Sequence, residues 1–459
     1  MLLSMRHCLY ALSIIAVLTL VIAVLMISDL EKQQNYIHFI GLTGLKVNEK
    51  EIEQASREVI PEPIILWWTG FTGERGAYKQ CGEDRCFFTA HRRYMRHPML
   101  KVFVFYGTDL KISDLPLPRQ PHHEWAVLHE ESPKNNILFS FQDMLVLFNH
   151  TCTFRRESDY AITTQHLKSQ KWLLDTKYMK STHDKNAFQK TLGLAPIIFT
   201  HSDCDPPSDR DHFVQLLMKH IPVDSYGKCL NNRRLPESLQ DPIKGMEHNE
   251  FFELVSKYKF SLAMENAVCK DYITEKLWRP LVVGSVPVIF GSPDVKDMLP
   301  SDHSGVVITD FATVENLAKF LHYLNNNDSA YEEYLNWKLT GITNPILKDI
   351  LSRREWSSDQ EGSMDFVTNF ECFICKRLHE NRRRMQKGLL PLKHVANESH
   401  YGCPVPHQFD ENGQVSGIHK RWMYEWSMSE KMAKAVRQLV EAGKNFTLKD
   451  LDAHLSLDL

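Results

Sequence analysis

The sequence of 459 residues is long enough for two folded domains with additional segments. Its formal net charge of −3 removes the electrostatic argument for a nucleic-acid partner. With 43% hydrophobic and 24% charged residues, the composition is ordinary for a globular protein.

The N-terminal segment predicts a membrane anchor. Residues 9–28, LYALSIIAVLTLVIAVLMIS, carry no charge, and 20 residues at a rise of ~1.5 Å span a bilayer core of ~30 Å. Arg6 precedes this run, whereas Asp29 and Glu31 follow it. The positive-inside rule therefore places residues 1–8 in the cytosol and the rest of the chain in a lumen. A cleaved signal peptide is the alternative, although the run is long for one and no A-x-A-like cleavage site follows.

Nine of the ten cysteines follow this anchor, which fits an oxidising lumen where disulfides form. Because nine is odd, at least one is free or pairs with another chain. The pair Cys372-x-x-Cys375 could indicate zinc or redox chemistry, but no second C-x-x-C or H-x-x-x-H completes a metal set, so a structural disulfide is favoured. Four N-x-S/T sequons are candidate glycosylation sites, the first of them in an apolar run: Asn149, Asn327, Asn397 and Asn445.

Two α/β domains are expected after a polar stem over 29–60. In the first, over 61–190, short apolar runs bounded by turn residues predict strands at 64–70, 101–109, 124–132 and 143–154. In the second, over 195–345, strands alternate with helices, which predicts a doubly wound parallel sheet. Its strands are expected near 195–200, 258–266, 285–291 and 304–311, and its helices over 209–221, 274–284 and 313–325.

The two sheets are expected to face each other across a cleft. Ligands of open α/β sheets bind beyond the carboxyl ends of the strands, so the loops 201–210 and 265–276 are candidate walls. Ser208 or Asp209 is placed to cap the helix that follows the first loop. The C-terminal extension over 346–459 is less regular, and its basic run 376–387 is read as a solvated helical face.

Charged residues in both loops suggest an anion site. A helix that begins near Thr274 presents backbone N–H groups, and Lys276 in its first turn adds a full charge that the helix alone does not favour. Arg210 stands at the start of another helix and offers a guanidinium fork to a phosphate. Asp203-x-Asp205 could instead hold a divalent metal, although prolines follow it directly and the pattern is common by chance.

Two further pairs of residues are weaker candidates for functional side chains. Glu130 and Glu131 end a strand and point to opposite faces, so one of them faces the cleft. His122 and His123 lack a third metal ligand at useful spacing, which favours surface or packing roles. The chain has no H-E-x-x-H, G-x-S-x-G or Walker motif.

The segment YKFSLAMENAVCKDYITEKLWRPLVVGSVPVIFGSP, residues 258–293, resembles the signature of the α1,3-fucosyltransferases, glycosyltransferase family 10. HEESPKNN, LFNHTCTFRRESDY and SDCDPPSDRDHFVQLL also look like family segments in the right order, so the resemblance covers about 60–345. HEESP, DPPSDRD, VDSYGKCL, EKLWRP and FECFICKR look most like the branch of vertebrate fucosyltransferases 10 and 11.

This resemblance implies a GT-B fold, GDP-β-L-fucose as donor, inversion at C1 and no metal or other cofactor. Carried over by motif, Glu131 of HEESP is the catalytic base. Tyr258, at the start of the signature, is a further candidate for the nucleotide pocket, whereas Lys270 and Arg279 are read as surface or packing residues and Asp271 as the cap of the turn into the helix. The donor-binding residues implied are Arg210, Asn266, Tyr272, Glu275 and Lys276.

The acceptor is less defined. Met264 and Ala267 stand where many members have Phe and Ser, and AITTQHL over 161–167 replaces a Tyr-Gly element of the Lewis-type enzymes. The branch implies fucose transfer either as an α1,3 linkage to N-glycan GlcNAc or to Ser/Thr of cysteine-rich protein domains. The expected location is the Golgi or endoplasmic reticulum membrane, as a single-pass type II protein with a luminal catalytic part. A luminal binding protein for glycans or GDP-fucose, without transfer activity, is the alternative.

Overall fold

The computed structural model describes residues 48–70, 76–356, 364–443 and 445–457. The predicted anchor over 9–28 and most of the stem lie outside these residues. Within the described part of the chain, no helix combines the length and apolar character needed to cross a membrane.

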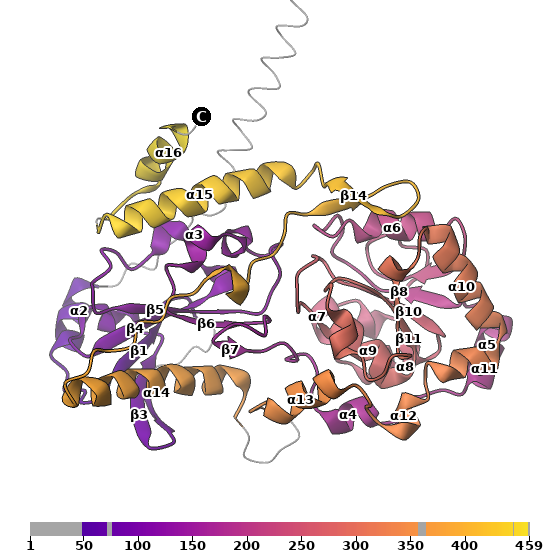
Figure 1. The fold of residues 1–459 in the computed structure, drawn as a ribbon, viewed down its shortest axis with the longest axis horizontal. Coiled ribbons are helices and arrows are strands. Elements are labelled where there is room, and N and C mark those ends of the chain that lie inside the picture. The colour runs from indigo at the N-terminus through magenta and orange to yellow at the C-terminus, as the bar shows by residue number, and fades with distance from the viewer. Residues whose placement is uncertain (1–47, 71–75, 357–363, 444, 458–459) are drawn as a thin grey trace, which may run out of the picture.

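The first lobe is built on a seven-stranded sheet in the order β2-β3-β1-β4-β5-β6-β7 (Figure 1). All neighbours pair in parallel except the β2–β3 hairpin at one edge. The strands are almost continuously apolar because the central ones are covered on both faces. They are β1 (Ile64–Trp67), β2 (Ala77–Cys81), β3 (Asp84–Thr89), β4 (Leu100–Tyr106), β5 (Glu124–His129), β6 (His150–Thr153) and β7 (Tyr160–Ala161).

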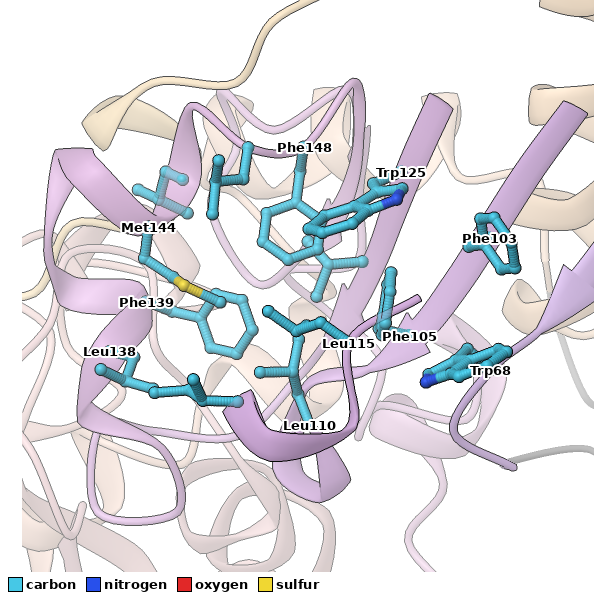
Figure 2. Packing of buried hydrophobic residues seen from close by; sticks show 14 of the residues in the cluster. Trp68, Phe103, Phe105, Leu110, Leu115, Trp125, Leu138, Phe139, Met144 and Phe148 are labelled. Atoms are coloured by element: carbon cyan, nitrogen blue, oxygen red, sulfur yellow. The ribbon is translucent and has the colours of Figure 1, made fainter. Parts of the chain in front are cut away.

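The strand expected over 143–154 is only partly correct. Residues Gln142–Leu145 form helix α3, and the strand β6 begins at His150. The buried side chains of this segment follow a helical rather than an alternating spacing, because Met144, Leu145, Leu147 and Phe148 occupy positions i, i+1, i+3 and i+4. Figure 2 shows Met144 and Phe148 turned into a cluster with Phe139, Phe105 and Trp125 against the sheet.

The second lobe contains a five-stranded, fully parallel sheet in the order β12-β11-β10-β8-β9. Its strands are β8 (Ile197–Phe199), β9 (Val223–Ser225), β10 (Phe260–Met264), β11 (Val286–Phe290) and β12 (Val306–Val307). Its helices are α6 (Arg210–Leu217), α7 (Pro242–Gly245), α8 (Asn249–Ser256), α9 (Glu275–Val283), α10 (Val314–Asn326), α11 (Asp328–Glu333) and α12 (Trp337–Thr340). The expected alternation of strands and helices is present, with the carboxyl ends of β8 and β10 leading into the loops 200–209 and 265–274.

Four shorter helices complete the N-terminal and linking regions. Helix α2 (Glu49–Ser56) precedes the first sheet, and Asn48 caps it by accepting a hydrogen bond from the backbone N–H of Lys50. Helices α4 (Gln170–Leu174) and α5 (Thr182–Leu192) join the two lobes, and α13 (Pro345–Arg353) leads the chain back to the first lobe.

The C-terminal extension is more regular than expected, because it contains the two longest helices of the described residues. Helix α14 (Phe366–Gln386) lies along one side of the first lobe and α15 (Met423–Glu441) along the other (Figure 1). The basic run 376–387 therefore belongs to a helix, although Arg377 and Arg383 form ion pairs with Asp159 and Asp84. A last helix, α16 (Leu448–Leu457), packs against α15.

Disulfides attach α14 to the first sheet. Cys372 and Cys375 are three positions apart and share a helix face, from which they bond to Cys81 of β2 and Cys86 of β3. The C-x-x-C motif is thus structural, as predicted, although the two cysteines do not pair with each other. Two further disulfides join Cys204 to Cys229 and Cys269 to Cys403. The odd cysteine is Cys152, which is free and buried.

Residues 394–441, which we call the C-terminal strap, contact both lobes. Residues 394–403 pack on the first lobe, where Ala396 N–H donates to Phe148 O. The hairpin of β13 (His407–Phe409) and β14 (Val415–Ile418) then lies on the second lobe, with the Phe409 ring 4.8 Å from Phe213. Helix α15 returns to α3 of the first lobe. The strap therefore links the two lobes in addition to the connections through α4, α5 and α13.

The four sequons differ in accessibility. The half-buried Asn149 accepts from Arg119 Nη2 at 2.6 Å and donates to His394 O at 2.8 Å, so its amide is already used in the fold. Asn327 caps α11, whereas Asn397 and Asn445 are exposed.

Candidate functional site

A pocket of about 400 Å³ opens where the carboxyl ends of strands in both lobes meet. The first lobe contributes residues after β5, and the second contributes the loops after β8 and β10 together with the start of α9. This is the place where open α/β sheets bind ligands. The pocket brings together all six residues assigned from the sequence: Glu131, Arg210, Asn266, Tyr272, Glu275 and Lys276.

The N-terminus of α9 forms one wall. Thr274 is the N-cap, and its hydroxyl accepts from the N–H of Lys276 at 3.3 Å. The buried Glu265 carboxylate accepts from the backbone N–H and the hydroxyl of Thr274 at 2.8 and 2.9 Å, which fixes this first turn. At the other end, Gly284 has the left-handed backbone expected of a C-cap.

Asp271 is not the cap that the sequence suggested. Its backbone is left-handed, at φ 63°, a region that Asp tolerates better than most residues. Its buried carboxylate accepts from Arg156 Nε at 2.7 Å and from Arg156 N–H at 3.1 Å. Because Arg156 belongs to the first lobe, Asp271 joins the loop after β10 to that lobe. The residue that caps α9 is Thr274.

Lys276 stands at the centre of the charged groups. Its ammonium lies 3.1 Å from Glu275 Oε1 and 3.5 Å from Glu265 Oε2. Burial opposes its charge, but the two carboxylates outweigh that effect and raise its pKa. Burial likewise opposes ionisation of Glu275, and the charges of Lys276, His166 and Arg279 overcome it and lower the pKa of that carboxyl. Both side chains are therefore ionised.

Arg210 is 1% exposed and stands at the start of α6. Its Nη1 donates to Met264 O and its Nη2 to Asp203 O, both at 2.9 Å, while Nε has no partner among the described residues. The guanidinium thus ties the ends of the two pocket loops together. Asp209 occupies the N-cap position predicted for it but makes no side-chain capping bond, and Ser208 donates to Glu265 O instead.

Glu131 faces this cationic wall from the first lobe. The Tyr272 hydroxyl lies 3.5 Å from its Oε2, and burial raises the pKa of the carboxyl while Lys276 partly lowers it. The neighbouring Glu130 points elsewhere, as expected for adjacent residues at a strand end. It accepts from the Tyr106 hydroxyl at 2.8 Å, and burial raises its pKa to about 7. Glu131 is therefore the carboxylate that meets the pocket.

Arg279 was assigned from the sequence to the surface or to packing; it packs rather than lying on the surface, and it also lines the pocket. Its side chain lines the pocket and is 7% exposed. The guanidinium lies over the Phe251 ring at 4.8 Å, and its Nη2 is buried without a hydrogen-bond partner in the described chain. The signal available in the sequence was its spacing, since i and i+3 positions share a helix face and Arg279 is three residues after Lys276.

Other assignments fall outside the pocket. Tyr258 is buried against Tyr226 and Asp224, to which its hydroxyl bonds at 2.8 Å each, and it does not line the pocket. Lys270 is a surface residue, paired with Glu157 at 2.5 Å, as predicted. His166 and His201 line the pocket without having been singled out, and His166 Nδ1 lies 3.9 Å from Glu275 Oε2.

The Asp203-x-Asp205 pair engages basic side chains. Asp203 forms an ion pair with Lys134 of the first lobe, and Asp205 pairs with Arg421 of the strap at 2.5 Å. These contacts give the two carboxylates a role in holding the loop against its neighbours.

Comparison with known proteins matches both lobes to one family. Residues 61–165 match the family model described as fucosyltransferase, N-terminal, and residues 193–393 match the model of glycosyltransferase family 10 (fucosyltransferase), C-terminal. GDP-fucose protein O-fucosyltransferase 3 of Gallus gallus is 46% identical over 392 residues, covering 84% of this chain and 82% of that protein. The protein of the same name from Homo sapiens is 43% identical over 417 residues, covering 90% and 86%.

Among solved structures, one of alpha1,3-fucosyltransferase with GDP-fucose is similar at a TM-score of 0.37 and 16% identity. That match covers 71% of this chain and 94% of the other.

Proposed function

Because the chain belongs to the fucosyltransferases of glycosyltransferase family 10, we propose that it transfers L-fucose from GDP-β-L-fucose to Ser or Thr hydroxyls of protein domains. The activity is that of a GDP-fucose-dependent glycosyltransferase. The observation that favours a protein acceptor is the identity of 43–46% to relatives named GDP-fucose protein O-fucosyltransferase 3. The two lobes with parallel sheets around a shared pocket support a GT-B-like arrangement.

In the proposed reaction Glu131 is the general base. Its ionised carboxylate takes the proton of the acceptor hydroxyl while that oxygen forms a bond to C1 of fucose. The bond from C1 to the phosphate oxygen breaks on the opposite side, so GDP leaves and the configuration at C1 inverts. General-base catalysis of this kind contributes ~10²–10⁴-fold. The position of Glu131 in the pocket, opposite a wall of cations, supports this role.

The donor is proposed to bind along α9. Negative charge develops on the β-phosphate as GDP leaves, and Lys276 with the N–H groups of the α9 N-terminus is placed to stabilise it. Arg210 holds the loops that form this site, and Glu275 can accept from a sugar hydroxyl. Asn266 and Tyr272 line the same space, and the Oδ1 of Asn266 is buried without a partner in the described chain. With these cations in place, we propose that turnover needs no metal ion.

A donor panel tests this proposal. The full chain is incubated with GDP-fucose, GDP-mannose, UDP-GlcNAc or UDP-galactose and a cysteine-rich acceptor domain, with and without EDTA, and the mass of the acceptor is measured. We expect an increase of one deoxyhexose with GDP-fucose alone, unchanged by EDTA. Binding of GDP-fucose without turnover would indicate a non-enzymatic binding protein, turnover of another donor would contradict the donor assignment, and loss of turnover in EDTA would contradict metal independence.

Arg279 is proposed as a further donor-binding residue, because its buried guanidinium lines the pocket with an unpartnered Nη2. A lost hydrogen bond to a charged group costs ~1.5–3 kcal/mol, so Arg279→Met should weaken GDP binding by roughly 10- to 150-fold in calorimetry. The control is Arg353→Met, which removes an exposed arginine of α13 and should leave the affinity unchanged. Equal affinities for the wild type and Arg279→Met would contradict the assignment.

The location is also a proposal. The apolar run over 9–28 and four disulfides in the described chain support a type II protein of the Golgi or endoplasmic reticulum with its catalytic part in the lumen.

A further inference from the structure

The C-terminal strap contacts the main chain of Glu131, a pocket-lining residue, from a part of the chain that the family models do not cover, since the second match ends at residue 393. Tyr401 of the strap is 0% exposed, and its hydroxyl donates to the backbone carbonyl of Glu131 at 2.9 Å. A residue 270 positions away in the sequence thereby contacts the main chain of the proposed base.

The ring of Tyr401 packs on two aromatic side chains of the first lobe, His129 and Phe154. It stacks on His129 with centroids 5.2 Å apart and an interplanar angle of 20°, and it lies 5.0 Å from Phe154. Phe154 in turn meets Tyr272 edge to face at 5.0 Å, and Tyr272 is the residue whose hydroxyl approaches the Glu131 carboxylate. Tyr401 therefore contacts the main chain of Glu131 directly, and through Phe154 it supports Tyr272, which lies beside the Glu131 side chain.

The segment around Tyr401 is held by the first lobe at residues 400 and 401 and by the second lobe at Cys403. Arg155 Nη1 donates to Tyr401 O at 3.0 Å, and Thr153 Oγ1 donates to the preceding carbonyl, His400 O, at 2.5 Å. Two residues later, Cys403 forms the disulfide with Cys269, which lies in the loop between β10 and α9. The strap consequently connects the loop that carries the base with the loop that lines the donor side.

We propose that Tyr401 is a positioning residue for the catalytic base, acting through the carbonyl of Glu131 and through the aromatic contacts to Tyr272. This inference rests on the proposed role of Glu131. Loops have few restraints of their own, and a displacement of a reacting group by ~1 Å can cost ~10²-fold in rate. The strap adds to the loop 130–136 a restraint that acts directly on the main chain of Glu131.

The test is Tyr401→Phe in the full chain, which keeps the ring and removes the hydroxyl. We expect kcat for fucose transfer to fall by about 10-fold or more, within that ~10²-fold range, while the KM for GDP-fucose stays within about twofold. The matched control is Tyr331→Phe in the second lobe, because the buried Tyr331 hydroxyl also donates to a backbone carbonyl, Lys259 O at 2.9 Å. Tyr331→Phe also removes the acceptor of the buried Lys185 ammonium, at 3.0 Å, so its melting temperature should fall at least as far as that of Tyr401→Phe. Tyr331→Phe should nevertheless retain kcat.

A double-variant cycle separates positioning from general destabilisation. If Tyr401 acts through Glu131, Tyr401→Phe should lower kcat little further in a Glu131→Gln background. If its effect were independent, it would lower kcat by the same factor in both backgrounds. An unchanged kcat in Tyr401→Phe, or full additivity with Glu131→Gln, would overturn the inference while the proposed base remained. Normal transfer by Glu131→Gln alone would instead overturn the proposed function.

Discussion

Glu131→Gln is expected to lower the kcat of fucose transfer by roughly 10²–10⁴-fold, the range that a general base contributes. The amide keeps the size of the carboxylate but cannot take the acceptor proton. The proposed donor-binding residues lie mainly in the second lobe, so the KM for GDP-fucose is expected to change little. Initial rates at saturating acceptor measure both constants, and a Glu131→Gln variant that retained normal transfer with an intact fold would contradict the base assignment.

The adjacent Glu130 provides the control, because it differs from Glu131 by one position and does not line the pocket. Glu130→Gln keeps an acceptor for the Tyr106 hydroxyl, so it should retain most of the activity.

The dependence of kcat/KM on pH provides a second test of Glu131 as the general base. In the proposed mechanism only the ionised carboxylate of Glu131 can accept the proton, and burial raises the pKa of this carboxyl. The value of kcat/KM should therefore fall as the pH drops through a pKa above the usual value for glutamate, ~4.3. Glu131→Gln should lose this acid limb.

Lys276→Met is expected to lower kcat/KM by roughly 10²–10³-fold, the loss typical of removing one group that stabilises developing negative charge in a water-poor site. The variant also leaves Glu265 and Glu275 close together without the cation between them, which adds repulsion toward the β-phosphate. Turnover and GDP affinity are measured together, because both should fall.

Lys270→Met is the matched control, since Lys270 lies on the same segment but is partly exposed and paired with Glu157. It should change kcat/KM by less than about twofold, because surface ion pairs contribute little. Equal effects of the two substitutions would show that net charge, rather than the position of Lys276, governs the reaction.

The donor side of the candidate site was predictable because most of its residues lie in one continuous segment of the sequence. The signature over 258–293 contains β10, the loop after it and α9, so Asn266, Glu275 and Lys276 come together through short-range geometry. Family membership, expected from this segment, is confirmed by both family models. Asp271 was misjudged because its partner, Arg156, lies in the other lobe.

Other features depend on contacts that no local pattern specifies. The sequence assigns Arg279 to the surface or to packing, and the contact with the Phe251 ring of α8 is what buries it beside the pocket. The partners of Cys372 and Cys375 follow from the docking of α14 on the β2–β3 hairpin. Tyr401 reaches Glu131 because the strap returns to the first lobe, and its sequence carries no chemical motif that would indicate this.

A structure with bound GDP-fucose tests the central claim most directly. The account predicts the β-phosphate at Lys276 and the N-terminus of α9, with C1 of fucose turned toward the Glu131 carboxylate and open on that side to an acceptor hydroxyl. A donor bound in another cavity, or a fucose whose C1 is shielded from Glu131, would contradict it.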